Sequence, residues 1–207
     1  MSNRFGQAYG LTLLSPILCD ADANGLPQEV SLRRELRELN ALPESPFAEV
    51  PTTHLARWVL IDDAPFEGAR AEIDHLASKY LIFTSNFDAG TSDDDTALGN
   101  YLELLRTKIP GTIESLYRHC IGFPGVKDAA AFQGYMKRCQ VPTSFLFGAY
   151  KQDSVEAVLR ALDAQRRMGE FVAAQQAKRS PPAQLQQDFN AFMAGLHAAR
   201  PPRPGTL

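Results

Sequence analysis

The chain has 207 residues, of which 44% are hydrophobic and 22% are charged, with a formal net charge of −3. This length suits one large domain or two small ones, and the composition is ordinary for a soluble globular protein. The slight negative charge gives no electrostatic basis for binding nucleic acid or an anionic membrane surface.

The cysteines and the apolar segments bear on the cellular compartment. Three cysteines without close pairing, Cys19, Cys120 and Cys139, argue against a disulfide framework and favour a reducing compartment. No apolar run approaches the ~18 residues that a membrane-spanning helix needs. Residues 8–18 favour a first strand over a signal peptide, because they lack a small-residue cleavage site. We therefore expect a cytoplasmic protein without a membrane span.

A helix follows the first strand and a polar loop. Residues 28–42 place leucines at near-helical spacing with charges on the opposite face. Pro27 suits its first turn, and Pro43 marks its end. The arginines at 33, 34 and 37 lie beside acidic residues, which indicates a solvated helix face.

The stretch PTTHLARWVLIDD, residues 51–63, predicts a second strand that is mostly apolar on both faces. The third strand, YLIFTSNF at 80–87, has the same property. A sheet with helices on one face leaves the other face open, so two such strands predict that something buries it. A second copy of the chain or this chain's own C-terminal segment would provide the cover. Alternatively, one face is merely less polar than average.

The order of the elements predicts the fold class. Residues 96–120 form two helical pieces broken at Pro110 and Gly111, with Asp95 or Thr96 as the cap. A short strand around 120–125 then completes the order β-α-β-β-α-β. This is an α+β, ferredoxin-like arrangement, in which an antiparallel sheet carries helices on one face.

The rest of the chain adds further elements. We expect a helix at 127–139, a strand at 142–150 and a long helix that begins at Asp153 or Ser154, with Glu156 in a capping box. After Pro181 and Pro182 comes an amphipathic helix, and the tail at 199–207 is predicted to be disordered. Residues 1–179 therefore form one ferredoxin-like α+β domain, followed at 180–207 by a C-terminal amphipathic helix and a Pro-rich tail.

Two acidic segments have structural explanations. The sequence DADANG at 20–25 fits the start of a calcium-binding EF-hand loop, but Ser31 stands where that loop needs a bidentate glutamate. A polar turn in which an Asp side chain caps the backbone explains it better. The run SDDDT at 92–96 suits the positive end of a helix dipole.

Five polar residues are candidates for a site: His54, Arg57, Asn86, Asp88 and His119. If the second and third strands pair, these groups converge near one end of the sheet. A buried histidine or arginine needs partners, so either a structural network or a ligand site accounts for them. Of these residues, His119 is the best candidate for a haem or metal ligand, although a histidine at a helix C-terminus is also stabilised by the dipole alone. Zinc spacing and the familiar phosphate-loop, hydrolase and metalloprotease motifs are absent from the sequence.

Three motifs in order resemble those of an uncharacterised bacterial family with ferredoxin-like folds. They are THLARW at 53–58, SNFDAG at 85–90 and HCIGFPG at 119–125, within a match over roughly residues 9 to 150. The family pattern is H-F-A-R-W, then S-N-F-D-G, then a helix ending in H-C-x-G-(Y/F)-P. Here Ala89 separates Asp88 from Gly90, which departs from that pattern and bears on any ligand role of Asp88. The resemblance marks His54, Arg57, Trp58, Asn86, Asp88, His119 and Cys120.

Members of that family resemble companions of catalase-like or peroxidase-like haem proteins. More distantly, the arrangement is similar to the dimeric α/β-barrel superfamily, which includes small monooxygenases, chlorite dismutases and dye-decolourising peroxidases. The resemblance implies a homodimer and an oxidative or haem-linked role, although a fold alone does not fix a function.

Two functions follow from these observations. The first is an oxidative or haem-linked enzyme with a pocket between sheet and helices. His119 would be the ligand or base there, Arg57 and Asp88 would orient an oxidant or substrate, and His54 and Asn86 would contact the cofactor. The second is a non-catalytic binding or accessory protein that acts with a haem peroxidase or catalase-like partner. A ligand site requires an open cavity of a few hundred Å³, whereas the accessory role predicts a filled core and internally bonded polar groups.

Overall fold

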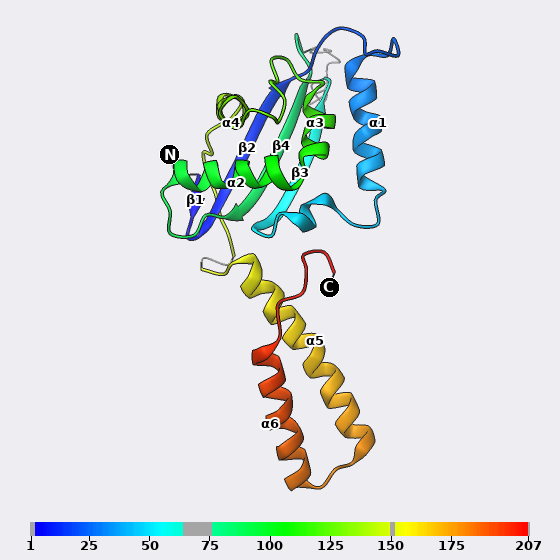
Figure 1. Ribbon diagram of the computed structural model, residues 1–207, viewed down its shortest axis with the longest axis vertical. Helices are drawn as coiled ribbons and strands as arrows, with labels where there is room; N and C mark the ends of the chain where they lie inside the picture. The colour runs from blue at the N-terminus through cyan, green and yellow to red at the C-terminus, as the bar shows by residue number, and fades with distance from the viewer. Residues whose placement is uncertain (1–2, 64–75, 150–151, 207) are drawn as a thin grey trace, which may run out of the picture.

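The computed structural model describes residues 3–63, 76–149 and 152–206. Its described part is an α+β protein with a four-stranded antiparallel sheet. Helices cover one face of the sheet, and a pair of C-terminal helices extends away from it (Figure 1). We refer to residues 3–63 and 76–149 as the α/β unit and to residues 155–198 as the helical hairpin.

The strands are β1 (Arg4–Phe5), β2 (Ala8–Pro16), β3 (Thr53–Ile61) and β4 (Tyr80–Asp88), in the spatial order β1-β2-β4-β3. The central strand β4 pairs with β2 on one side and with β3 on the other. The β-branched and aromatic residues of these strands suit a pleated, half-buried surface. The order β2-α1-β3-β4-α2 matches the first five elements of the predicted ferredoxin-like arrangement.

The predicted fourth strand around 120–125 does not form. The chain turns there, and Cys120 makes a single bridge to Ile17 beside β2. Gly122 and Gly125 adopt positive φ angles of 72° and 84°, which a continuous strand does not contain. The described part of the predicted strand at 142–150 also lacks strand pairing.

The helices of the α/β unit begin and end largely where the sequence predicts. They are α1 (Gln28–Asn40), the short 3₁₀ helix η1 (Pro46–Glu49), α2 (Asp94–Lys108), α3 (Pro110–Tyr117) and α4 (Ala129–Arg138). Pro110 begins α3, as predicted, because proline cannot continue the preceding helix. The cap of α2 is Asp93 rather than Asp95 or Thr96, and its carboxylate accepts hydrogen bonds from both of those backbone N–H groups.

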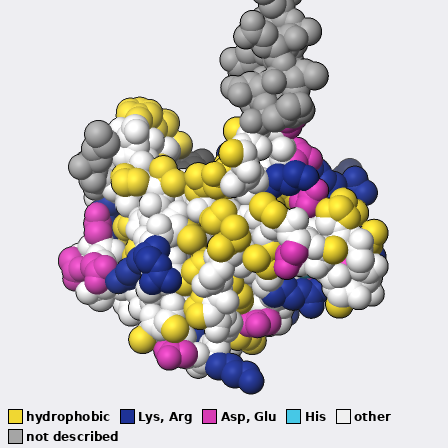
Figure 2. Space-filling model, turned by 90° about the horizontal axis from the view of Figure 1, so that it is seen from above, with side chains coloured by type: hydrophobic (Ala, Val, Ile, Leu, Met, Phe, Trp, Pro, Cys, Tyr) yellow, Lys and Arg dark blue, Asp and Glu magenta, His cyan; other side chains and the backbone are white. Residues whose placement is uncertain are grey.

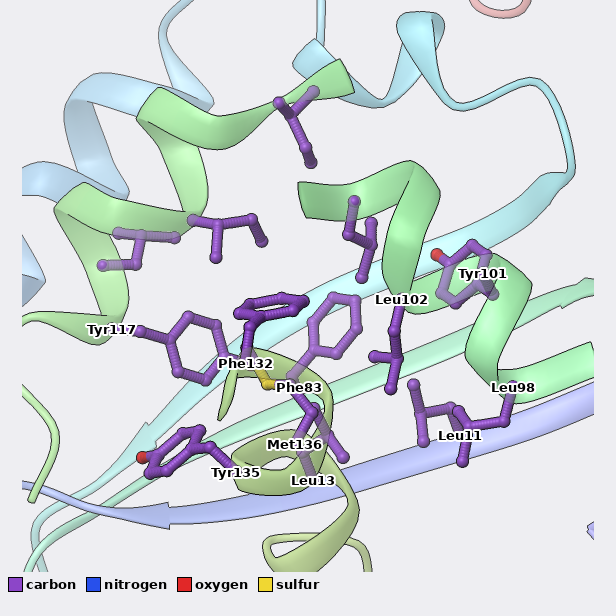
Figure 3. Close-up of a cluster of buried hydrophobic side chains, with 14 of the residues drawn as sticks. Leu11, Leu13, Phe83, Leu98, Tyr101, Leu102, Tyr117, Phe132, Tyr135 and Met136 are labelled. Atoms are coloured by element: carbon purple, nitrogen blue, oxygen red, sulfur yellow. The ribbon is translucent and has the colours of Figure 1, made fainter. Parts of the chain in front are cut away.

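The hydrophobic core lies between the sheet and α1 to α4 (Figure 3). Phe87 of β4 stacks on Tyr101 of α2, with ring centroids 3.9 Å apart. The buried hydroxyl of Tyr101 shares hydrogen bonds with Ser85 at 2.6 Å and with Thr53 at 3.1 Å. Desolvation raises the pKa of Tyr101, so this hydroxyl stays protonated and holds α2 on the sheet. The labelled core residues are Leu11, Leu13, Phe83, Leu98, Tyr101, Leu102, Tyr117, Phe132, Tyr135 and Met136.

The helical hairpin consists of α5 (Val155–Lys178) and α6 (Pro182–Ala198). Phe171 of α5 stacks on Phe192 of α6, with centroids 4.7 Å apart. The sequence-based division at 179 therefore separates two helices that pack on each other. Ser154 caps α5 by accepting from the N–H of Ala157, in place of the predicted capping box.

Candidate functional site

His54 and Asp88 lie together where β3 begins and β4 ends. A register shift between Thr53 and Leu55 makes His54 the extra residue of a bulge, a feature that re-aims side chains. Nε2 of His54 is 2.7 Å from Oδ1 of Asp88. The other oxygen, Oδ2, accepts a 3.0 Å hydrogen bond from the N–H of Val155, the first residue of α5. Both carboxylate oxygens are engaged, and Asp88 anchors the hairpin to the sheet.

Arg57 and Asn86 face the side of the sheet that the helices leave open. Nε of Arg57 donates to Oγ1 of Thr84 at 3.0 Å. Both residues line a hollow with a volume of ≈ 410 Å³, together with Leu55 and Thr84. The terminal nitrogens of Arg57 make no hydrogen bond to a described residue. Two of the five predicted site residues therefore border an open space.

His119 belongs to a different part of the molecule. Its Nδ1 is 2.6 Å from Oε1 of Gln28, and its Nε2 is 3.3 Å from Oε1 of Glu35. Both partners are on α1, so His119 ties the end of α3 to that helix. The residue is 3% exposed, and it lines none of the described cavities.

The two histidines lie at opposite ends of the sheet. The carbonyl of His119 accepts from the N–H of Leu18, just past the end of β2. Asp88, the partner of His54, pairs with Ala8 at the start of β2. Eight residue steps of about 3.4 Å place the ends of β2 about 27 Å apart. His119 therefore does not converge with the other four residues.

The surroundings of His119 do not fit a haem ligand. An axial histidine needs a ring nitrogen that faces the iron, whereas both nitrogens of His119 contact protein side chains. Burial raises the pKa of the neighbouring Cys120 thiol to about 12, so it is protonated and unreactive near neutral pH. Within the described ranges, no group of three His, Cys, Asp or Glu side chains is placed to hold a metal ion.

The loop that resembles an EF-hand is a turn, as predicted. Oδ1 of Asp22 accepts from the N–H groups of Asn24 and Leu26, and Oδ2 accepts from the hydroxyl of Ser31 at 2.6 Å. These hydrogen bonds lower the pKa of Asp22 to about 2, and the one from Ser31 has the largest effect. Its carboxylate oxygens thus close the turn before α1.

A further cavity includes only Arg57 of the five predicted site residues. It is a groove of ≈ 600 Å³ between α1, the connection to η1 and the strand β3. Arg33 and Arg37 are on a solvent-exposed face of α1, as predicted, and both also line this groove with Arg57. Their spacing of four residues, which places them on one face of α1, is the signal that could have indicated it. The lining residues are Arg33, Leu36, Arg37, Leu39, Asn40, Leu42, Ser45, Pro46, Phe47, Ala56, Arg57, Trp58 and Leu60.

Comparison with protein-family models, with curated proteins and with solved structures finds no match to this chain. In the described part of the chain, no helix combines the length and the hydropathy that a membrane span requires.

Proposed function

We propose that this chain is a non-catalytic binding protein that self-associates through the open face of its sheet. The observation that carries the proposal is a contrast in exposure. His54, Asp88 and His119 have internal partners, whereas large apolar side chains remain in contact with water. Leu55 of β3 is 70% exposed, and Phe147, in the segment after α4, is 69% exposed.

The chain itself covers only part of this open face. Gly10 of β2 lies under Leu146, so close that a Cβ on Gly10 would be 3.0 Å from Cδ1 of Leu146. Phe147 contacts Phe5 of β1, with ring centroids 5.7 Å apart. The segment after α4 therefore covers the β1–β2 side of the open face, and Leu55 on the β3 side stays exposed.

A second copy of the chain is the occupant that we propose for the remaining surface. Two sheets pack face to face at about 10 Å when their facing side chains are apolar. A two-fold arrangement would bury Leu55 and Val59 of both copies, and it would form the dimeric α/β barrel that the resemblance implies. Figure 2 shows that hydrophobic side chains are also exposed, among charged ones, on the side of the α/β unit seen from above. Burial of such area contributes about 25 cal/mol per Å².

The mass of the protein in solution tests this proposal. Sedimentation velocity should give a dimer for the unmodified chain and a monomer for Leu55→Asp, because the new carboxylate would be buried between the sheets. Val30→Asp is the matched control: Val30 is an exposed apolar residue of α1, away from the sheet face, and this variant should remain dimeric. A monomeric unmodified chain, or equal effects of the two variants, would contradict the proposal.

A titration with haemin tests the alternative, an oxidative or haem-linked function. We expect no sharp Soret band, because the surroundings of His119 do not suit haem. The observation that favours the alternative is that Arg57 and Asn86 line the ≈ 410 Å³ hollow. A Soret band that Arg57→Gln weakens would replace the non-catalytic proposal with the haem-linked one.

A further inference from the structure

The groove between α1 and β3 has the size of a small-molecule site. Its volume of ≈ 600 Å³ falls within the roughly 300–1,000 Å³ that is usual for such sites. One wall is the C-terminal half of α1. The other is β3, the last strand of the sheet, which has no further strand beside it among the described residues.

Three arginines give the groove a local positive charge. Arg33 and Arg37 come from successive turns of α1, and Arg57 comes from β3. None of the described lining residues is acidic. Arg33 is paired with Asp62 at 2.7 Å, whereas the side chain of Arg37 makes no hydrogen bond or ion pair to a described residue. In a chain of net charge −3, a groove lined by three arginines, one of which is paired with an aspartate, differs in sign from the whole molecule.

Two acidic side chains near the groove are engaged elsewhere. Glu35 of α1 pairs with Arg118, and Glu44, in the connection to η1, lies 3.1 Å from Arg203 of the C-terminal tail. These pairs leave the guanidinium fork of Arg37 available. A guanidinium fork matches a carboxylate or phosphate in two parallel hydrogen bonds.

The floor of the groove is apolar and aromatic. Phe47 of η1 packs against Trp58 of β3, with ring centroids 5.3 Å apart. Leu36 and Leu39 of α1 face them across the groove. This combination of an aromatic floor with cationic walls suits a ligand that has a flat apolar body and one anionic end.

We propose that this groove binds a small organic anion, with a carboxylate or phosphate group held by Arg37 at the α1 wall and an aromatic body on Trp58. The described lining residues include no His, Cys, Asp, Glu, Lys or Tyr, and the hydroxyl oxygen of Ser45 is engaged as the cap of η1, where it accepts from the N–H of Phe47. These residue types are the usual proton donors, acceptors and nucleophiles of enzymes. The site is therefore built to hold its ligand rather than to transform it.

Trp58 makes the proposal directly testable, because it is the one tryptophan of the chain. Its indole N–H gives a unique resonance in a ¹H–¹⁵N NMR spectrum. Titration of the full-length protein with benzoate and with phenyl phosphate should move this resonance saturably. Benzamide, the neutral counterpart of benzoate, should move it much less. The anion with the lower dissociation constant identifies the preferred anionic group.

Substitution of the arginines separates specific binding from general surface charge. Arg37→Gln should raise the dissociation constant for the preferred anion about tenfold or more, the usual effect of losing a charged hydrogen bond. Arg34→Gln is the matched control, since Arg34 is a neighbouring exposed arginine of α1 that does not line the groove. It should leave the dissociation constant unchanged.

Three results would overturn the proposal. They are an indole resonance that neither anion moves, equal responses to benzoate and benzamide, and equal weakening by Arg34→Gln and Arg37→Gln. The outcome is independent of self-association, because Leu55→Asp changes a side chain outside the groove. This variant should retain anion binding whether it is a monomer or a dimer.

Discussion

His119 is held at both ring nitrogens, and its contacts decide what the residue does. Gln28 and Glu35 are 91 and 84 residues away in sequence, and the fold brings them to hydrogen-bonding distance. A buried side chain with two such partners stabilises the packing of α3 on α1. Loss of the ring would leave the buried amide oxygen of Gln28 without its donor.

We therefore expect His119→Ala to lower the free energy of unfolding by about 1–3 kcal/mol, the range for a buried polar group that loses its partner. Urea denaturation followed by circular dichroism measures this change. His197→Ala is the control, because His197 lies exposed on α6 and its Nδ1 contacts only the carbonyl of Met193. If both variants unfold at the same urea concentration, His119 does not stabilise the fold.

Whether the sequence predicts a residue's contacts depends on how far apart in the sequence the two contacting residues are. The turn at Asp22 is predictable, because its bonds to Asn24 and Leu26 span two and four residues. The pairing of His54 with Asp88 follows from the pairing of two predicted strands. The contacts of His119 with α1 depend on how the helices pack, which neither periodicity nor spacing reveals.

At the scale of the elements, Asp88 links the sheet to the hairpin. Its carboxylate accepts from the first N–H group of α5 and contacts His54 of β3. A negative charge at this position also interacts favourably with the helix dipole. The start of α5 therefore depends on a residue 67 positions earlier in the chain.

Asp88→Ala should loosen the first turn of α5 by about 1 kcal/mol, as the loss of a helix cap does. Amide hydrogen exchange in that turn should accelerate about fivefold, while exchange in β2 stays unchanged. Asp153→Ala is the matched control, because Asp153 is an exposed carboxylate beside the same helix start with no hydrogen bond to a described residue. Equal acceleration in the two variants would show that Asp88 does not anchor the hairpin.

Most helices and strands follow from local sequence patterns. Leucine spacing locates α1, and Pro110 separates α2 from α3. The predicted fourth strand fails because the sheet edge at β2 is taken up by β1 and by the bridge of Gln140 to Leu13, and only Cys120 of the predicted strand makes a bridge, to Ile17. This competition for the edge of β2 depends on the tertiary fold. In the sequence, only the glycines at 122 and 125 indicate that a continuous strand does not form.

At the scale of the whole molecule, the α/β unit and the helical hairpin contribute unequally to the buried hydrophobic core. The buried hydrophobic residues all lie between Tyr9 and Met136, except for Val155. No residue of α6 is buried. The apolar stripes of α5 and α6 were predictable from their periodicity. Their packing on each other rather than on the sheet was not, because an amphipathic pattern does not identify the surface it faces.

This distribution predicts that a chain ending at residue 153 folds without the hairpin. Its free energy of unfolding should fall by no more than about 1.5–3 kcal/mol, the contribution of one buried valine, because Val155 is the one buried residue of α5. Urea denaturation followed by the fluorescence of Trp58, which the shortened chain retains, measures the change.

Val155→Ala in the full-length chain is the control, because it removes most of the same side chain and leaves the hairpin in place. The two variants should therefore lose similar free energies of unfolding. A shortened chain that lacks dispersed amide resonances would show instead that the sheet requires the hairpin to fold. The mass of the shortened chain adds a second result: if it folds and remains a dimer, the sheet face alone is sufficient for self-association, whereas a folded monomer would assign that role to α5 and α6.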